Sequence, residues 1–209
     1  PVHKKRLYEI GFSFPGQTEF FASRWGGTPV MMLCADNLRV VPATIHIPLS
    51  KVSSNIKNID LNSLIVAMKN GLQRYFHISD PVIACCGINP HAGEDGHLGK
   101  EEKEFLMPAL AQIRKEHGVN VTDPLAADSL FSPHIRTKFD AILGMYHDQV
   151  LGPFKALAFS SGVNATLGLP YLRTSPDHGT ADDIAGQNRA DHSPMLAALQ
   201  MACGAIQSQ

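Results

Sequence analysis

The stretch Val82-Ile-Ala-Cys-Cys-Gly-Ile-Asn-Pro90 decides the fold class. Its first seven residues are almost wholly apolar, and the Asn-Pro pair ends the run. A strand that is apolar at successive positions is typical of a sheet covered on both faces, as parallel sheets are. Apolar residues at helical spacing over 58–76 precede this strand, and a second helix is predicted over 99–116. This alternation of strand and helix predicts an α/β fold.

Further short elements extend the pattern on both sides. The apolar runs 30–35 and 38–45 flank an Asp-Asn turn and predict a hairpin. Four more elements are expected: a strand at 139–145, an edge strand at 120–122, a helix opening at 182–185 and a last helix over 193–206 with Ser193 as its N-cap.

Composition limits the classes of partner. The 209 residues carry a formal net charge of -1, which provides no basic field for nucleic acid. The apolar runs are too short to span a bilayer, so we expect no membrane partner and a cytoplasmic protein. The four cysteines lack C-x-x-C spacing and are expected to be reduced core thiols. A structural zinc site or a disulfide is the alternative.

Three histidines follow three predicted strands. His46, His91 and His147 each lie just beyond the carboxyl end of an apolar run. Ligands of open α/β sheets gather at that edge, and histidine is the commonest metal ligand. A single histidine of this kind is more often a surface residue, but the repeated placement predicts one divalent metal site. Asp148 could orient His147 as a hydrogen-bond partner, or it could be a plain turn carboxylate.

Two loops favour ligand binding. The glycine-rich loop 87–99 allows close approach of backbone to a ligand, although it matches neither nucleotide-binding glycine fingerprint. The segment 177–186 resembles the adenosine-binding segment of isopropylmalate and isocitrate dehydrogenases. The resemblance implies NAD contacts from His178, Gly179, Thr180, Ala181 and Asp183. The alternative is an ordinary helix start with acidic residues in its first turn.

Taken in order, nine motifs resemble the 4-hydroxythreonine-4-phosphate dehydrogenase family. Among them are Gly11-x-Ser-Phe-x-Gly-x-Thr-Glu-Phe20, Thr44-x-His-x-Pro-Leu49, Gly87-x-Asn-Pro-His-Ala-Gly-Glu94, Met145-Tyr-His-Asp-Gln149 and Val163-Asn-x-Thr-Leu-Gly-Leu-Pro170. The match extends from about residue 8 to residue 203. The chain is identified on these motifs as a member of that family, without the family's N-terminal segment.

The resemblance implies a fold, a reaction and a set of site residues. The fold is the two-domain α/β/α architecture of isocitrate and isopropylmalate dehydrogenases, with 15–150 on the metal and substrate side and 151–209 as an incomplete cofactor-side domain. The reaction is NAD-dependent, metal-dependent oxidation and decarboxylation of 4-phosphohydroxy-L-threonine to 3-amino-2-oxopropyl phosphate. The metal is zinc, cobalt, magnesium or nickel, and it lies at the interface of a homodimer. The implied residues are His46, His91 and His147 for the metal and Thr18, Lys155, Asn164 and Arg173 for the substrate.

One substrate position departs from the family. Gln17 stands where the family has a histidine, so it is included among the expected substrate-binding residues. Lys155 is the first candidate for proton transfer, with Asp128 and Asp148 after it. The departure favours one rival function, that of a paralogue acting on threonate or erythronate 4-phosphate or on a cis-dihydrodiol carboxylate. Two rival functions of different classes are a metal-dependent hydrolase and a non-catalytic interaction protein.

Overall fold

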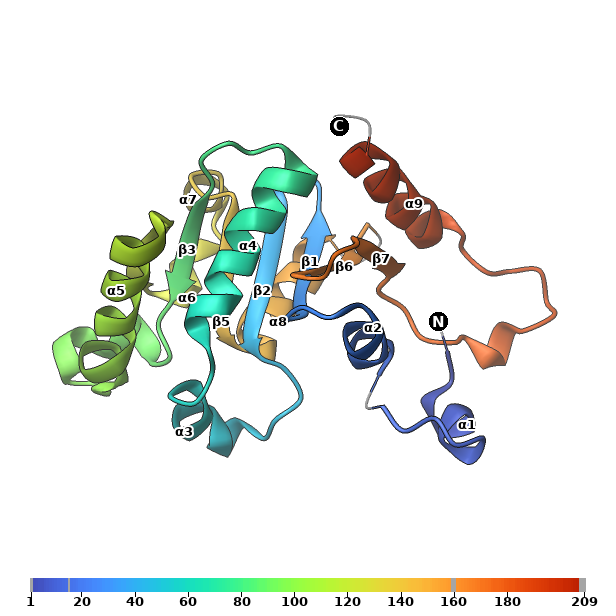
Figure 1. Cartoon of the computed structure of the whole chain (residues 1–209), viewed down its shortest axis with the longest axis horizontal. Coiled ribbons are helices and arrows are strands. Elements are labelled where there is room, and N and C mark those ends of the chain that lie inside the picture. The colour runs from blue at the N-terminus through green and yellow to red at the C-terminus, as the bar shows by residue number, and fades with distance from the viewer. Residues whose placement is uncertain (1, 15, 159–160, 207–209) are drawn as a thin grey trace.

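The computed structural model describes residues 2–14, 16–158 and 161–206. Within these ranges seven strands form one sheet in the order β4-β3-β5-β2-β1-β6-β7 (Figure 1). The strands are β1 Val30–Ala35, β2 Leu38–Thr44, β3 Val82–Cys86, β4 Asn120–Leu125, β5 Ala141–Tyr146, β6 Val163–Leu167 and β7 Arg173–Pro176. Residues 15, 159–160 and 207–209, on which the predicted domain limits partly fall, lie outside the described residues.

The sheet is mixed, and its parallel half carries the histidines. β4, β3, β5 and β2 are parallel neighbours, with Thr44 opposite Tyr146 and Ile83 opposite Ala141. β1 is antiparallel to both β2 and β6, which confirms the predicted hairpin, and β7 is antiparallel to β6. The carboxyl ends of β3, β5 and β2 therefore meet at one edge of the sheet.

Helices cover both faces of the sheet. The longer helices are α2 Gln17–Trp25, α4 Leu61–Phe76, α5 Met107–His117, α8 His147–Ala158 and α9 Ser193–Ile206. The short ones are α1 Lys4–Glu9, α3 Val52–Ile56, α6 Ala127–Leu130 and α7 Pro133–Arg136. In Figure 1, α4 lies in front of the sheet and α8 behind it. Two apolar cores result: Met68 and Leu72 of α4 pack in one, and Val150 and Phe154 of α8 in the other.

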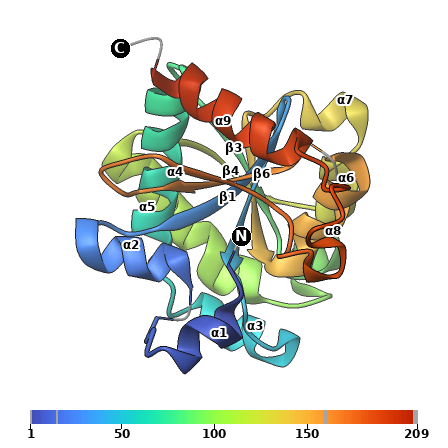
Figure 2. The ribbon, with the colours of Figure 1, turned by 90° about the vertical axis from the view of Figure 1, so that its right-hand side faces the viewer.

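The two ends of the described chain lie at the β7 side of the sheet. Figure 2 shows α1 below the sheet and α9 above it. α9 packs on β7, and Thr174 Oγ1 donates to Ala198 O at 2.9 Å. Arg6 of α1 lies 3.8 Å from the Asp182 carboxylate, so the first helix touches the loop between β7 and α9. β6 and β7 extend the same sheet as β1, and the division into 15–150 and 151–209 stays a prediction.

Several predicted elements need correction. The segment 58–76 forms a helix only from Leu61, because the Asp60 carboxylate accepts from Ser63 N at 2.9 Å and caps it there. The predicted helix 99–116 is a π-helical turn, Glu102–Leu106, followed by α5. The segment 182–185 opens no α-helix and forms only the 3₁₀ turn Asp182–Ile184. The helices α2 and α8 and the strands β6 and β7 were not predicted.

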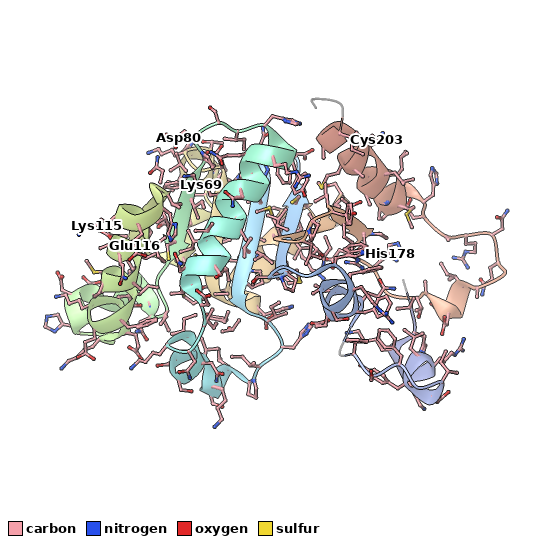
Figure 3. All side chains as sticks on the ribbon, in the orientation of Figure 1. Lys69, Asp80, Lys115, Glu116, His178 and Cys203 are labelled. Carbon is pink, nitrogen blue, oxygen red and sulfur yellow. The ribbon has the colours of Figure 1, made fainter. Side chains whose placement is uncertain are left out.

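The cysteines are free thiols, and three of the four are buried as expected. Burial raises the pKa of Cys34 and of Cys86 to about 12, so both thiols are protonated and inert near neutral pH. Cys203 is the exception, since it is exposed on α9 (Figure 3). Among the described residues, none of the helices has the length and apolar character that crossing a membrane requires.

Candidate active site

Two of the predicted metal ligands lie side by side at the sheet edge. His46 follows the end of β2, and His147 comes directly after β5. β2 and β5 are paired in parallel register, and Thr44 Oγ1 donates to Met145 O at 2.7 Å beside the two strand ends. The ring centroids of His46 and His147 are 5.9 Å apart. The parallel ladder thus sets both imidazoles at one place.

Asp148 holds the ring of His147. The Asp148 Oδ1 to His147 Nδ1 distance is 2.6 Å, while the Asp148 side chain is 90% exposed. A carboxylate on one ring nitrogen fixes the imidazole so that the other nitrogen is free for a ligand. The geometry supports the orienting role for Asp148 rather than the role of a plain turn residue.

His91 is presented in another way, on a left-handed turn. Five consecutive residues, His91 to Asp95, have positive φ angles, from 42° to 82°. Four of the five are not glycine, and the left-handed conformation costs such residues about 1–2 kcal/mol each. Strain of this kind persists only where surrounding contacts impose it.

Lys103 Nζ donates to Asp95 O at the end of the turn, and the contacts that hold its beginning converge on Glu102, which is 2% exposed. Its carboxylate accepts from the backbone N–H of Ile88 and of Asn89, each at 2.8 Å, and from Asn89 Nδ2 at 3.0 Å. A β-carbon on Gly93 would lie 2.7 Å from Glu102 Oε2, so only glycine fits there. A buried carboxylate with several N–H donors is thus the anchor of the His91 loop.

The three histidines do not form one cluster within this chain. His46, His147 and Asp148 line a cavity of about 270 Å³, whereas His91 and Asp128 line a separate one of about 250 Å³. Tyr146 contributes to the walls of both. Among the described residues, no three histidine, cysteine, aspartate or glutamate side chains are close enough together to hold a metal ion. The chain therefore supplies a pair of imidazoles plus a third at a neighbouring position.

Four of the five predicted substrate residues come together, and Lys155 does not line the same cavity. Gln17, Thr18, Asn164 and Arg173 line a cavity of about 540 Å³, which His46 and His178 also line. Arg173 Nη2 donates to Gln17 Oε1 at 2.8 Å, and Asn164 Oδ1 is buried without a hydrogen-bond partner among the described residues. Burial lowers the pKa of Arg173, and the nearby Glu19 carboxylate opposes that shift. A partly buried cation beside an unpaired polar atom is typical of a ligand site.

The candidates for proton transfer are divided among three places. The Lys155 ammonium lies on α8, 3.1 Å from the Asp177 carboxylate. Asp128 lines the His91 cavity, and Asp148 is bonded to His147. The salt bridge ties Lys155 to the residue that precedes His178, so α8 and the expected cofactor segment are linked.

The expected cofactor segment is largely exposed. Its residues Gly179, Thr180, Ala181 and Asp183 lie at the surface, in the loop that leads to α9. His178 alone of these lines the 540 Å³ cavity, and its place on that loop is seen in Figure 3. His178 Nδ1 is 2.9 Å from Gly179 O, and Ala181 has φ 52°. The acidic helix start proposed as the alternative is absent here, since only a three-residue 3₁₀ turn follows.

Comparison with known proteins identifies the family. Residues 1–202 match the family described as "Pyridoxal phosphate biosynthetic protein PdxA". The chain belongs to the PdxA family. A curated relative, 4-hydroxythreonine-4-phosphate dehydrogenase of Xanthobacter autotrophicus, is 48% identical over 211 residues, which are 97% of this chain and 59% of the relative. The chain thus spans about three-fifths of the length of the curated relatives it matches.

Solved structures of the PdxA family confirm the fold. The crystal structure of 4-hydroxythreonine-4-phosphate dehydrogenase from Klebsiella pneumoniae superposes with a TM-score of 0.89 at 37% identity, covering 99% of this chain and 63% of the other. A terephthalate 1,2-cis-dihydrodiol dehydrogenase from Burkholderia xenovorans superposes with a TM-score of 0.73 at 30% identity, covering 94% of this chain and 63% of the other. The isocitrate/isopropylmalate dehydrogenase-like α/β fold expected from the sequence is confirmed.

Sequence reasoning missed residues that build the PdxA-family site in this chain. Glu102 lies in the predicted helix 99–116 without being singled out there, and its carboxylate is turned inward. Gln149 connects the two strand ends, since Met145 N donates to its Oε1 at 2.6 Å and its Nε2 donates to Gly87 O at 2.7 Å. The signal for Gln149 was its place in the Met145–Gln149 motif, whereas nothing in the sequence distinguishes Glu102 from the exposed Glu104.

Proposed function

We propose that this protein is an NAD-dependent, divalent-metal-dependent dehydrogenase of pyridoxal phosphate biosynthesis. Its reaction is the oxidation and decarboxylation of 4-phosphohydroxy-L-threonine to 3-amino-2-oxopropyl phosphate. The observation that carries the proposal is the 540 Å³ cavity, which brings Gln17, Thr18, Asn164 and Arg173 together with His46. The curated relatives, at 46–51% identity, bear the name of this enzyme.

The substrate is proposed to bind through charge and hydroxyl contacts. Arg173 would hold an acidic group, because guanidinium N–H groups make charge-assisted bonds to phosphate or carboxylate. Its orientation is already set by Gln17 and by Thr166 Oγ1, 3.5 Å away. Thr18 and Asn164 provide donors and acceptors for the hydroxyl groups, and the unpartnered Asn164 Oδ1 is available to accept a hydrogen bond.

The metal site is proposed at His46 and His147, whose adjacent rings and oriented tautomer fit a divalent ion. His91 is the proposed third donor. Since its ring lines a separate cavity in the single chain, we propose that the site is completed at the interface of a homodimer. A bound divalent ion would supply Lewis-acid stabilisation of negative charge on substrate oxygens. Zinc, cobalt, magnesium and nickel all remain in the proposal, as imidazole suits several of them.

Lys155 is the proposed proton donor, and its ammonium is held in place by Asp177. Asp128 and Asp148 are proposed in supporting roles beside His91 and His147. NAD is proposed to bind along 178–183, with the Asp183 carboxylate accepting from ribose hydroxyls. The same carboxylate would repel the 2′-phosphate of NADP, and like charges at close range cost several kcal/mol. The cytoplasm is the proposed location.

The proposal is tested by turnover. Purified protein is assayed with NAD, with a divalent metal and with 4-phosphohydroxy-L-threonine, and carbon dioxide and NADH are measured together. His46→Ala, His91→Ala and His147→Ala should each remove metal and activity while leaving the circular dichroism spectrum unchanged. Full metal occupancy in any of these variants would exclude that histidine as an essential ligand. Equal kcat/KM with NAD and NADP would refute the cofactor assignment.

A second candidate is a paralogue with the same chemistry on another substrate. It is favoured by Gln17 and by the structural similarity to a cis-dihydrodiol dehydrogenase. The substrates to compare are 4-phosphohydroxy-L-threonine, threonate and erythronate 4-phosphate, and a cis-dihydrodiol carboxylate. Gln17→His should raise kcat/KM for the first relative to the second by about tenfold if the enzyme is a specialised paralogue. An unchanged ratio would return the assignment to the biosynthetic enzyme.

A further inference from the structure

The basic start of the described chain, His3-Lys4-Lys5-Arg6, has no part in the proposed function so far. α1 sends these side chains to different places. Lys4 lines the 540 Å³ cavity together with Leu7, one helical turn further along the same face. Arg6 instead faces Asp182, and Lys5 lies at the surface outside the cavity wall.

The Lys4 ammonium lies over the amino end of α2. Its Nζ is 3.9 Å from the point that a β-carbon on Gly16 would occupy. Gly16 is the N-cap of α2 and offers no side-chain cap. The first N–H groups of a helix lack partners within the helix and attract anions. The same cavity is lined by Gly16, Gln17 and Thr18, so the Lys4 side chain and the amino end of α2 both border it.

The two cations of this cavity, Lys4 and Arg173, form no salt bridge among the described residues. Arg173 donates only to the neutral oxygens of Gln17 and Thr166. The carboxylate that lines the cavity is Glu19, which offsets one of the two positive charges. With Glu19 counted, whose Oε2 is 2.9 Å from the Gly16 β-carbon position, one net positive charge and the helix terminus remain to attract an anion. A phosphate group has three terminal oxygens for Lys4, Arg173 and the helix N–H groups, whereas a single carboxylate has two.

We propose that Lys4 binds the substrate's phosphate group together with Arg173 and the amino end of α2. Lys4 is then a specificity-determining residue, because it favours a phosphorylated substrate over one that carries only a carboxylate. The inference rests on the proposed function for the identity of the substrate. It also separates the cis-dihydrodiol carboxylate from the phosphorylated substrates of both candidates, since that carboxylate has no phosphate to engage Lys4.

The test is phosphate binding, which needs neither NAD nor turnover. Inorganic phosphate is titrated calorimetrically at constant ionic strength into the parent protein, Lys4→Gln and Lys5→Gln. Lys5→Gln is the matched control, because it removes the same charge from the neighbouring residue of the same helix. Lys4→Gln should weaken phosphate binding about tenfold, which corresponds to ~1.4 kcal/mol, while Lys5→Gln should stay within about twofold. Lys4→Arg should restore most of the affinity.

Three results would overturn the inference. They are unchanged affinity in Lys4→Gln, equal losses in Lys4→Gln and Lys5→Gln, and no phosphate binding by the parent protein. A failure of the dehydrogenase proposal is recognised separately, by no NADH formation with any substrate of the panel. In that case a selective loss of phosphate binding in Lys4→Gln would still establish Lys4 as an anion-binding residue.

Discussion

His46 and His147 are positioned by the sheet, whereas His91 is positioned by a loop whose backbone adopts the left-handed conformation that non-glycine residues disfavour. The first two come directly off parallel strands whose register is fixed by the ladder and by the apolar cores. His91 lies beyond β3 on five residues with positive φ, and the buried Glu102 carboxylate holds the start of this loop while Lys103 bonds to Asp95 at its end. The difference indicates that the third histidine depends on a few local contacts, with Glu102 the buried one, while the other two share the stability of the whole fold.

Removing the anchor should have the largest effect. Glu102→Ala leaves the N–H groups of Ile88 and Asn89 without their acceptor and opens a cavity beside Gly93. We expect a loss of about 3 kcal/mol in the free energy of unfolding, since bonds to a charged partner contribute about 1.5–3 kcal/mol. Urea unfolding followed by circular dichroism measures it. Glu104→Ala, at an exposed site on the same turn, should cost under about 0.5 kcal/mol; equal costs would mean that Glu102 is no anchor.

Removing the hydrogen-bond partner of a strand-end histidine should lower metal affinity and leave the free energy of unfolding unchanged. Asp148→Asn keeps the size of the side chain but removes the negative charge 2.6 Å from His147 Nδ1. Loss of such a partner typically costs 10–100-fold in metal affinity, so we expect about that change in Kd for zinc in a chelator competition. Asp80→Asn, an exposed turn carboxylate, is the control and should leave Kd unchanged. An unchanged Kd in Asp148→Asn would remove its orienting role.

The left-handed conformation of the His91 turn can be tested by replacing alanine with glycine at two positions. The two replacements should change the free energy of unfolding in opposite directions. Ala92 has φ 52°, a conformation that glycine adopts at no steric cost, so Ala92→Gly should stabilise the protein by about 1 kcal/mol. Ala111→Gly, at an exposed position inside α5, should destabilise it by about 1 kcal/mol. Thermal unfolding of both variants gives the comparison. Destabilisation by both would argue against a left-handed turn.

The smallest effect is expected from Glu101, next to the anchor. Hydrogen bonds from Ser53 Oγ and Asn89 Nδ2 lower the pKa of this carboxyl from 4.5 to about 2. A lowered folded-state pKa stabilises the protein above pH 4.5, and this contribution is lost as the pH falls from 4.5 through 2. Because the group is only partly buried and solvent screens it, the contribution should be under about 1 kcal/mol. Glu101→Gln should flatten the stability profile in that window, and an unaltered slope would contradict this.

The sequence predicted the elements of the fold in which apolar residues recur at the spacing of a helix or a strand. Clear apolar patterns mark the hairpin 30–45, the strands near 82 and 139, and the helices predicted over 58–76 and 193–206. The structure confirms these elements, and the first helix begins at Leu61. β6 was missed because Asn164 and Thr166 interrupt a short run among glycines. α8 was missed because it begins at His147, directly after the strand predicted at 139–145, and because Pro153 lies inside the helix.

The sequence predicted the site residues that directly follow strands. It predicted less of the site where tertiary contacts determine the backbone conformation and the burial of a side chain. The positions of His46 and His147 follow from strand ends, and their proximity follows from parallel pairing. The left-handed turn at His91 has no local signal, since His, Ala, Glu and Asp all prefer the right-handed region. Burial of Glu102 depends on Gly87 and Gly93, where a β-carbon would lie 3.1 Å and 2.7 Å from its carboxylate oxygens. The sequence does not show this proximity, because it arises only when the loop is folded.

The pairing of β1 with β6 has a consequence for synthesis of the chain. β1 has its hairpin partner β2 almost at once, but its other edge pairs with Val163–Leu167, which emerge from the ribosome much later. At about 5–20 residues per second, that edge waits on the order of ten seconds. An unpaired, apolar edge strand is a template for pairing with a neighbouring nascent chain. Slower translation after residue 35 should therefore increase co-translational aggregation, and chaperone binding to ribosome-bound chains should fall once β6 is exposed.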